Sequence, residues 1–556
     1  MQIRIENNIK RSVLFCVCLF CMFFVLSFLA FYKGWNTGWN YDSIGFSYLA
    51  KKNSLSTLLS LHIDKTSRFV YHTVYYLLNK YFGYQGWDWF LFKIALHAFN
   101  ALLLLIVVKL ILQYYASINN YAIPILTALL FLLAPTTTEV VLYQAAIQFL
   151  FTYSLLYLCI LLVIFYIRSG KKALVWIYFA LFFIALFSLE TSYTFPAIAF
   201  LLVAFYPGIK IKSKQTVLVV LIPILFVLSV LFINYALFGD SLSHYGQQKH
   251  LNISLDKLIQ NMLKIPLDFI AFIEYWKMDY IYKVYNILYK KEAIYLFAVL
   301  FILIYLSLWK KYLNDQLSKP FWMCIHILFV MILPTIALGI LYIIPIEEDR
   351  YLYYPSGMIF FCIVWILYKI SPKLMYAGVA CLLFIGFLFL QKNIYSWTIT
   401  QKTIDYSLSS FPYEKGKRYI LLASPVYANG VLIWDTHETD KDPFEDKYQI
   451  LGKALYVKQN IDVMDKIAPV LQYNIINEKE SPEISTLNDS TLKMTLPCCG
   501  KWWWKHNSGA QDMETGYYKI KMVGGWQQEV HIQFKQKPKD LVYIYQCGTQ
   551  FCKYDF

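Results

Sequence analysis

Long apolar runs, repeated along the first 400 residues, are the feature that most limits how this chain can fold. Apolar residues make up 58% of the 556 residues and charged residues only 15%, whereas a soluble chain usually carries about 25% charged residues. Residues 401–556 contain 19 basic and 19 acidic residues, so the net charge of +15 lies entirely in the apolar part. A basic excess between long apolar runs is typical of membrane proteins. The composition therefore excludes a soluble enzyme, a disordered regulator and a nucleic-acid-binding protein.

The apolar runs predict eleven membrane spans, because a bilayer core about 30 Å thick needs about 20 apolar residues per helix. The stretch Ala173–Pro207 counts as two spans that turn near Glu190, because basic clusters stand at both of its ends. The first span is long and lacks a small-residue cleavage site, which favours a retained anchor over a signal peptide. The predicted spans begin near Val13, Trp89, Tyr121, Phe149, Ala173, Tyr193, Val217, Ala293, Phe321, Pro355 and Leu374.

Clusters of Lys and Arg predict the orientation of the bundle. With eleven spans all of these clusters fall on one face, which the positive-inside bias makes cytoplasmic. An odd number of spans from a cytoplasmic N-terminus then places the C-terminal part outside the cytoplasm. We therefore expect an all-α polytopic protein of the bacterial inner (plasma) membrane. The clusters are Arg4, Lys10 and Arg11; Arg168, Lys171 and Lys172; Lys210, Lys212 and Lys214; Lys310, Lys311 and Lys319; and Lys369 and Lys373.

A change in composition after Trp397 divides the chain into a membrane domain, 1–400, and a C-terminal domain, 401–556. YILLASPVY and VLIW have the pattern of strands, and residues 441–472 that of a helix. Four segments between KMTLPCC and LVYIYQ predict a β-rich end. The C-terminal domain is therefore expected to be mixed α/β.

Four of the eleven cysteines lie in this polar domain, and the other seven lie in apolar runs, where they are expected to pack as small apolar side chains. No spacing among the four resembles a zinc site. Two disulfides formed in an oxidising compartment are the better interpretation, and they agree with an extracytoplasmic position. The pairing is open. The four are Cys498, Cys499, Cys547 and Cys552.

Three acidic residues lie near predicted span ends on the outer face. Asp42, in WNYDSIGF, follows the first span, and an interfacial helix cap or solvated acid is its structural alternative. Glu139, in APTTTEVVLYQ, lies at a depth where a carboxylate needs a partner or water. Glu190, in FSLETSYTFP, is either a helix cap or a functional acid. All three are candidates for chemistry at this face.

Arg68 and Arg350 stand out because the outer face has few cations. The planar guanidinium group fits phosphate oxygens. The structural alternatives are a lipid-headgroup contact for Arg68 and a salt bridge with Glu347 or Glu348 for Arg350. Acids and arginines that converge on one side of a membrane bundle suit a lipid-linked phosphate and a hydroxyl acceptor.

Two long outer loops run from Lys33 to about Trp87 and from Gly239 to about Lys291. The second contains DFIAFIEYWKMDY, whose spacing predicts a helix along the membrane surface. In the C-terminal domain, KWWWKH carries three neighbouring tryptophans, which suit a strand, a contact with a glycan, or membrane docking. They are Trp502, Trp503 and Trp504.

Together these segments resemble the GT-C superfamily of polyprenyl-phosphate-sugar-dependent glycosyltransferases, in particular the O-mannosyltransferases that carry tetratricopeptide repeats. The resemblance covers residues 10–400, in matching order. Ser43 stands where the family usually has a second acid, Phe69 replaces a proline, and residues 401–556 stand in place of the repeats. The matching segments after Asp42 are SRFVYHTVYYLLNKYFG, KIALHAFNALLL, LLFLLAPTTTEVVLY, FSLETSYTFPAIAFLL, EEDRYLYYPSG and QKNIYSW.

The resemblance implies an inverting hexosyl- or pentosyltransferase that moves a sugar from a polyprenyl-phosphate donor to a hydroxyl of a glycan, lipid or protein. It implies that Asp42 is the general base, helped by Glu139. It also implies that Arg68 and Arg350 bind the lipid phosphate. Some relatives use a divalent metal, although no His-rich ligand set is seen here, and no other cofactor is expected. Further candidates for substrate contact are Glu190, His97 and Tyr351.

Two other classes of membrane protein remain as alternatives. A flippase or transporter for a lipid-linked glycan would show internal repeats and polar residues at mid-bilayer, neither of which is clear in this sequence. A glycan polymerase or ligase would use a much larger lipid-linked donor and a different loop pattern.

Overall fold

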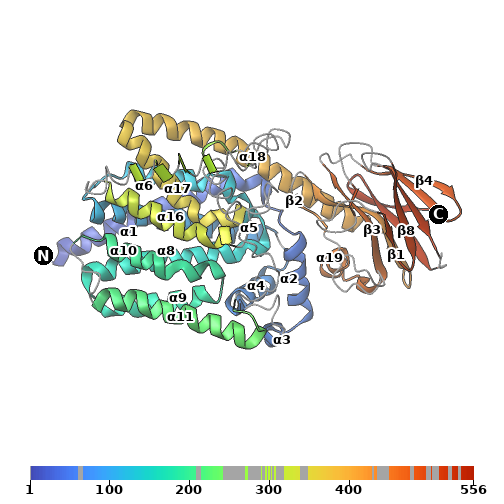
Figure 1. Cartoon of the computed structure of the whole chain (residues 1–556), viewed down its shortest axis with the longest axis horizontal. Coiled ribbons are helices and arrows are strands. Elements are labelled where there is room, and N and C mark those ends of the chain that lie inside the picture. The colour runs from blue at the N-terminus through green and yellow to red at the C-terminus, as the bar shows by residue number, and fades with distance from the viewer. Residues whose placement is uncertain are drawn as a thin grey trace.

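A bundle of helices is joined to a domain of two β-sheets in the computed structural model of the chain (Figure 1). Every described element before Ser409 is helical. The structure describes residues 2–60, 67–84, 86–207, 214–241, 269–272, 318–337, 349–428, 431–434, 450–475, 481–495, 502–503, 512–523, 529–535 and 540–556, together with isolated residues between 290 and 307.

Six helices in the described part of the chain are long and apolar enough to cross a membrane. A seventh candidate is the pair formed by α6 (Ala122–Leu132) and the segment Pro135–Leu142, which is bent by 60°. The prediction of a membrane protein is thereby confirmed. The six are α1 (Gln2–Phe31), α5 (Gly86–Tyr115), α8 (Ile147–Ser169), α11 (Lys214–Phe238), α17 (Asp349–Ile370) and α18 (Pro372–Ser409).

Three shorter apolar helices lie at three more of the predicted spans: α9 (Lys172–Leu186), α10 (Phe195–Phe205) and α16 (Lys319–Ala337). The remaining predicted span, near Ala293, lies mostly outside the described residues, as does most of the second outer loop with its expected surface helix. The count of eleven therefore stays a prediction.

The chain folds back between α9 and α10, as the charge pattern predicts. The ring of Phe195, the first residue of α10, lies 5.6 Å from Phe182 and 5.9 Å from Tyr178 in α9. A continuous helix would separate these rings by roughly four to five turns. The short 3-10 helix η5 (Glu190–Thr194) fills the turn and begins at Glu190.

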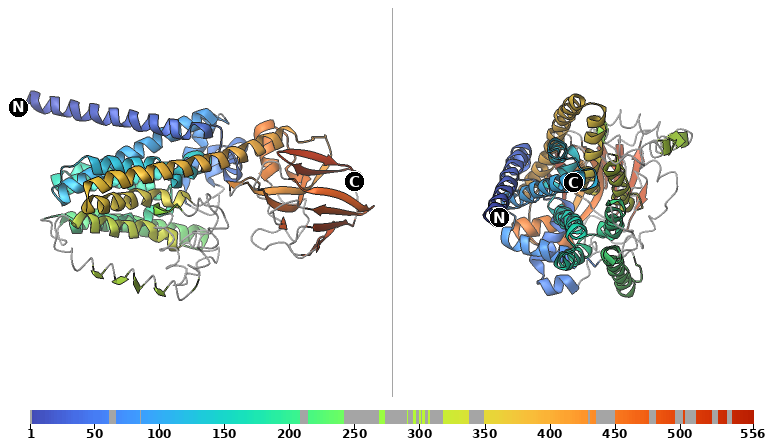
Figure 2. Two further views of the ribbon diagram at one scale, coloured as in Figure 1. Left: turned by 90° about the horizontal axis from the view of Figure 1, so that it is seen from above. Right: turned by 90° about the vertical axis from the view of Figure 1, so that its left-hand side faces the viewer.

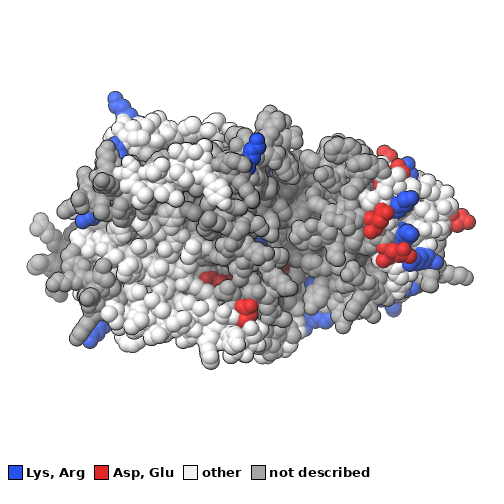
Figure 3. Space-filling model, viewed as in Figure 1, with Lys and Arg blue, Asp and Glu red and all other residues white. Residues whose placement is uncertain are grey.

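α5 forms the centre of the bundle, where it packs against α1, α6 and α8 and is buried along most of its length. Helices at the periphery instead expose apolar side chains, such as Phe232 of α11 and Trp176 of α9. Lipid tails are as apolar as such side chains, so these faces need no protein partner. In Figure 3, described charged side chains are sparse over the bundle, while both signs are frequent over the C-terminal domain.

α18 connects the two parts of the molecule. It runs along the bundle and continues without a break into the C-terminal domain (Figure 2). The predicted domain boundary at residue 400 therefore falls inside a helix of 38 residues.

The C-terminal domain contains two sheets and one described α-helix, α19 (Ile450–Gln459), so the prediction of a mixed α/β domain is confirmed. In the first sheet the order is β11-β10-β1-β3-β6, with β2 (Val431–Leu432) beside β1. Its strands are β1 (Arg418–Ala428), β3 (Ile467–Ile475), β6 (Trp502–Trp503), β10 (Leu541–Cys547) and β11 (Gln550–Tyr554).

The second sheet is antiparallel, in the order β4-β5-β9-β8-β7, and buries alternate residues of β5 and β9. Its strands are β4 (Glu483–Asn488), β5 (Thr491–Thr495), β7 (Met513–Glu514), β8 (Tyr518–Val523) and β9 (Glu529–Phe534). Of the three tryptophans, Trp502 and Trp503 form β6 in the first sheet, and Trp504 lies outside the described residues.

The helix predicted over 441–472 is wrong at its C-terminal end, because residues 467–475 form strand β3. Pro469 lacks the N–H that a helix interior requires. The segment instead pairs in parallel with β1, with Leu421 opposite Pro469. In the described part of the predicted stretch, α19 (Ile450–Gln459) and the short 3-10 helix η8 (Met464–Lys466) are helical.

Candidate functional site

Glu139 and Arg350 form a buried ion pair at the end of the bundle that adjoins the C-terminal domain. Arg350 donates from Nη1 to Oε1 of Glu139 at 2.8 Å, and its backbone N–H donates to Oε2 at 2.9 Å. The Glu139 side chain is 2% exposed and that of Arg350 25%. The pair satisfies the requirement that a carboxylate at this depth have a partner. Arg350 is thus paired with Glu139; Glu347 and Glu348 lie outside the described residues.

Glu139 and Arg350 each lie in the first turn of a helix. Pro135 ends the apolar run of α6, since proline removes a helical hydrogen bond and restricts the residue before it. The chain then forms the 3-10 helix η3 (Pro135–Thr137) and the five-residue helix α7 (Thr138–Leu142), which carries Glu139 in its first turn. Arg350 lies in the first turn of α17, so two helix starts meet at this pair.

Asp42 lies beside this pair, in the first turn of α2 (Tyr41–Lys52). Its backbone N–H donates to the hydroxyl of Tyr143 at 3.1 Å. Its carboxylate is within electrostatic range of Glu139, Arg350 and Tyr143. The structure thus brings together three of the predicted site residues, from three separate parts of the chain.

Arg68 and Glu190 form a second ion pair. Nε of Arg68 donates to both carboxylate oxygens of Glu190, at 2.7 and 3.0 Å. Arg68 immediately precedes α4 (Phe69–Phe82), and Glu190 begins η5. The stacked rings of Phe69 and Phe187, 4.3 Å apart, hold the two segments together. Two interpretations of Glu190 were considered, a helix cap and a functional acid. In either one, its carboxylate is bound to Arg68.

Hydrogen bonds join α2 and α4 to the segment that follows α7. Tyr71 of α4 donates to the carbonyl of Ala145 at 3.3 Å, and the Ala145 N–H donates to Oγ of Ser43 at 3.0 Å. The hydroxyl of Tyr75 donates to the Ser43 carbonyl at 3.0 Å. Because Ser43 follows Asp42 and Tyr71 lies one turn from Arg68, both ion pairs belong to the same end of the bundle.

His72, one turn after Arg68, is buried against the ring of Phe46, 5.7 Å away. Burial, together with the positive charge of Arg68, lowers the pKa of His72 from 6.5 to about 4. Its imidazole is therefore neutral at physiological pH.

His97 is fully buried within the bundle, where both of its ring nitrogens are hydrogen-bonded. Nε2 donates to the carbonyl of Leu132 at 3.1 Å, which leaves Nδ1 to accept from the hydroxyl of Tyr353 at 2.8 Å. Neither nitrogen is available to a substrate in this arrangement. Tyr351 packs edge-on against Phe149, and the guanidinium of Arg350 lies 5.3 Å from its ring, so Tyr351 borders the first ion pair.

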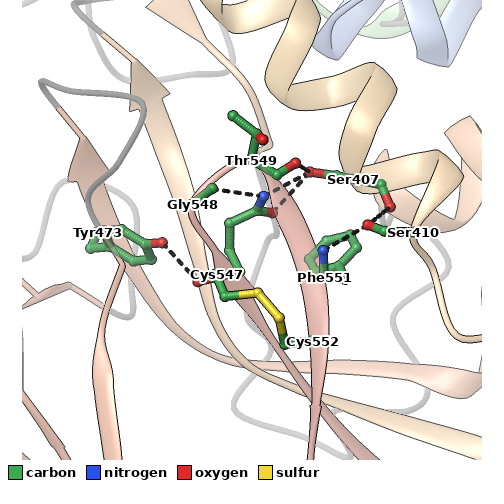
Figure 4. Close-up of a disulfide and its surroundings, with 9 residues drawn as sticks. Ser407, Ser410, Tyr473, Cys547, Gly548, Thr549, Phe551 and Cys552 are labelled. Carbon is green, nitrogen blue, oxygen red and sulfur yellow. Dashed lines mark hydrogen bonds between the residues drawn. A yellow bond between two sulfur atoms is a disulfide. The ribbon is translucent and has the colours of Figure 1, made fainter.

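Cys547 and Cys552 form a disulfide that closes the turn between β10 and β11 (Figure 4). This turn contacts the end of α18: Ser407 donates to the carbonyl of Thr549, and Ser410 accepts from the N–H of Phe551. One of the two expected disulfides is therefore present, whereas Cys498 and Cys499 lie outside the described residues.

No group of three or more His, Cys, Asp or Glu in the described part of the chain is arranged to hold a metal ion.

Sequence reasoning did not single out Tyr143 and Lys93. Tyr143 follows Glu139 by four residues, a helical spacing that places both on one side and was a usable signal. Lys93 interrupts the apolar run of α5 and is 1% exposed. Among the described residues its ammonium group has no hydrogen-bond partner.

The chain matches no protein-family model, and no curated protein is significantly similar to it in sequence.

Proposed function

We propose that this chain is an integral membrane glycosyltransferase that transfers a sugar from a polyprenyl-phosphate donor to a hydroxyl of a glycan, lipid or protein. The observation that carries the proposal is the convergence of Asp42, Glu139 and Arg350 at one end of a membrane bundle. This combination supplies a carboxylate for a hydroxyl group and a cation for a phosphate. The order of motifs shared with GT-C enzymes supports the same function.

In the proposed reaction Asp42 accepts the proton of the acceptor hydroxyl as its oxygen attacks the anomeric carbon. The new carbon–oxygen bond forms as the bond to the lipid phosphate breaks, and the phosphate leaves with the bonding electron pair. Attack opposite the leaving group inverts the anomeric configuration. Asp42 suits the role of base better than Glu139, because Asp42 is partly exposed while both oxygens of Glu139 are bound to Arg350.

Arg350 is proposed to stabilise the charge that grows on the leaving phosphate. In the described part of the chain Nη1 is the only atom of its guanidinium group with a hydrogen bond, and a quarter of the side chain is exposed. The remaining N–H groups can therefore donate to phosphate oxygens. Glu139 orients the arginine for this contact. We propose the same two functions for the second ion pair: Arg68 contacts phosphate and Glu190 orients it. This pair lies at the same end of the bundle as the first.

The proposed site faces the outside of the cytoplasm, and two observations support this side. α8 begins beside the site and ends after 23 residues at the basic cluster of Arg168, Lys171 and Lys172. This end lies about 34 Å away, as expected of a cytoplasmic face. The disulfide in the C-terminal domain also fits an oxidising compartment. A bacterial inner membrane with an outward-facing donor headgroup is consistent with both.

The test is transfer of labelled sugar from synthetic polyprenyl-phosphate sugars by the purified full-length protein. Asp42→Asn should fold normally and lose about 10²- to 10⁴-fold in rate. Glu139→Gln and Glu190→Gln are measured in parallel, and Asp88→Asn, at an acid in the first turn of α5, is the matched control. An active Asp42→Asn beside an inactive Glu139→Gln would show that the wrong acid is assigned. Full activity of all variants would refute the mechanism.

A further inference from the structure

Helix α2, which carries Asp42, is shared between the membrane bundle and the C-terminal domain. Ile44, two residues after Asp42, is 1% exposed and belongs to the hydrophobic core of the C-terminal domain, together with Ile404 of α18 and Leu455 of α19. Ile44 thus completes a core whose other buried members lie more than 350 residues further along the chain. The preceding residue of α2, Ser43, contacts the bundle instead, and its hydroxyl accepts from the Ala145 N–H.

The N-terminal end of α2 is also held by the C-terminal part of the chain. The N–H of Trp39 donates to Oε1 of Gln401 in α18 at 3.0 Å. The side-chain amide of Asn40 donates to the carbonyl of Leu432 in β2 at 2.7 Å. Asn40 precedes the helix, where asparagine commonly caps the first turn, yet it makes no such cap here. Its side chain connects Asp42's helix to the C-terminal domain instead.

Lys51 fixes the other end of α2. Its ammonium group donates to the carbonyls of Tyr456 and Val457, at 3.2 and 3.1 Å, and to Oδ1 of Asn460 at 2.5 Å. These groups form the C-terminal end of α19, where Asn460 adopts a left-handed conformation with φ of 58°. The last carbonyls of a helix lack partners within it and carry partial negative charge. A lysine is therefore well suited to this position.

Residue 42 is thus positioned from three directions: by the bundle through Tyr143, and by the C-terminal domain at both ends of its helix. We infer that the C-terminal domain is a positioning element of the site, which holds Asp42 through the contacts of α2 with α18, β2 and α19. The catalytic consequence rests on the proposed function, whereas the placement of α2 by Lys51 is testable without it.

Lys51→Ala is the discriminating variant, because Lys51 lies nine residues from Asp42, roughly 13 Å along the helix, and so cannot touch the reacting atoms. Lys52→Ala is the matched control: Lys52 is its neighbour, but donates to Tyr48 on the same helix. In the full-length protein in nanodiscs, Lys51→Ala should speed hydrogen exchange of amides 41–52 by about tenfold, while strands of the second sheet keep their protection. Lys51→Arg, which can still donate to carbonyls, should restore protection.

In the transfer assay, Lys51→Ala should lower kcat by about tenfold to a hundredfold with KM within about twofold, and Lys51→Arg should recover most of the rate. Exchange in α2 no faster than in Lys52→Ala would overturn the inference. So would faster exchange with an unchanged kcat. If the wild-type protein transfers no sugar from any donor, the proposed function fails, and the exchange measurement alone decides whether the C-terminal domain positions α2.

Discussion

Arg350 contacts Glu139 through two different groups, since its backbone N–H and its Nη1 each donate to a separate carboxylate oxygen. The backbone N–H belongs to the first turn of α17, so the contact holds the start of that helix against α7 as well as orienting the side chain. A carboxylate is also favoured at a helix N-terminus, where the amides carry partial positive charge. The pair is therefore part of the fold of the bundle in addition to its proposed function.

Replacement of Arg350 by alanine should harm both stability and activity, because it leaves Glu139 buried without its partner. Loss of one member of a buried pair costs about 3–5 kcal/mol, which should appear as a lower Tm of the purified protein. The double variant Glu139→Gln with Arg350→Met removes the uncompensated charge and should recover most of the Tm but none of the transfer activity. A single variant as stable as wild type would mean that water or another group replaces the arginine.

Stability should depend on the protonation of His72. The pKa of His72 is about 4 in the folded state and 6.5 in the unfolded chain, so the unfolded state binds the proton more readily. The contribution of neutral His72 to the free energy of unfolding is constant above pH 6.5. It is lost as the pH falls toward 4, by up to about 3 kcal/mol. We expect the Tm to decrease between pH 7 and pH 5, and less so in His72→Gln. Equal slopes for both proteins would contradict this account.

Lys93→Met should raise the stability of the bundle. The ammonium group of Lys93 is buried in α5 with no hydrogen-bond partner among the described residues, and methionine has nearly the same shape without the charge. Removal of an unpaired buried polar group is worth about 1–3 kcal/mol. Lys109→Met in the same helix is the control: Lys109 donates to Asn119 and lies 3.8 Å from the ring of Tyr121, so its loss should lower the Tm. A lower Tm for Lys93→Met would indicate a partner for this lysine.

The C-terminal domain should be reached by reagents from outside the cell. Leu487 in β4 is 49% exposed, and Leu487→Cys should react with a membrane-impermeant maleimide in intact cells. Cys547 and Cys552 should react only after reduction, because they are joined in a disulfide. Labelling of Leu487→Cys only after lysis would place the domain in the cytoplasm and overturn the proposed orientation.

Much of the bundle was predictable, because a membrane helix is a local property of about 20 apolar residues. The break at Pro135 and the turn at Glu190 were also visible, as proline geometry and charge placement act over short distances. The C-terminal domain was harder to predict. Residues 467–475 have an apolar pattern that suits a helix or a strand, and only pairing with β1, 47 to 48 residues away along the chain, selects the strand.

Local sequence patterns were enough to predict a membrane protein, to single out Asp42, Glu139 and Arg350 by their positions, and to predict that a polar α/β domain follows the bundle. The partners in the two ion pairs follow only from the tertiary structure. Glu139 and Arg350 are 211 residues apart, and Arg68 and Glu190 are 122 apart. Nearby acids such as Glu347 offered Arg350 an equally reasonable partner. Which carboxylate meets which arginine depends on how helices pack around α5, and a linear pattern does not contain those distances. The same is true of α2, whose place between two domains follows from burial of Ile44 in a core that forms only when the whole chain has folded.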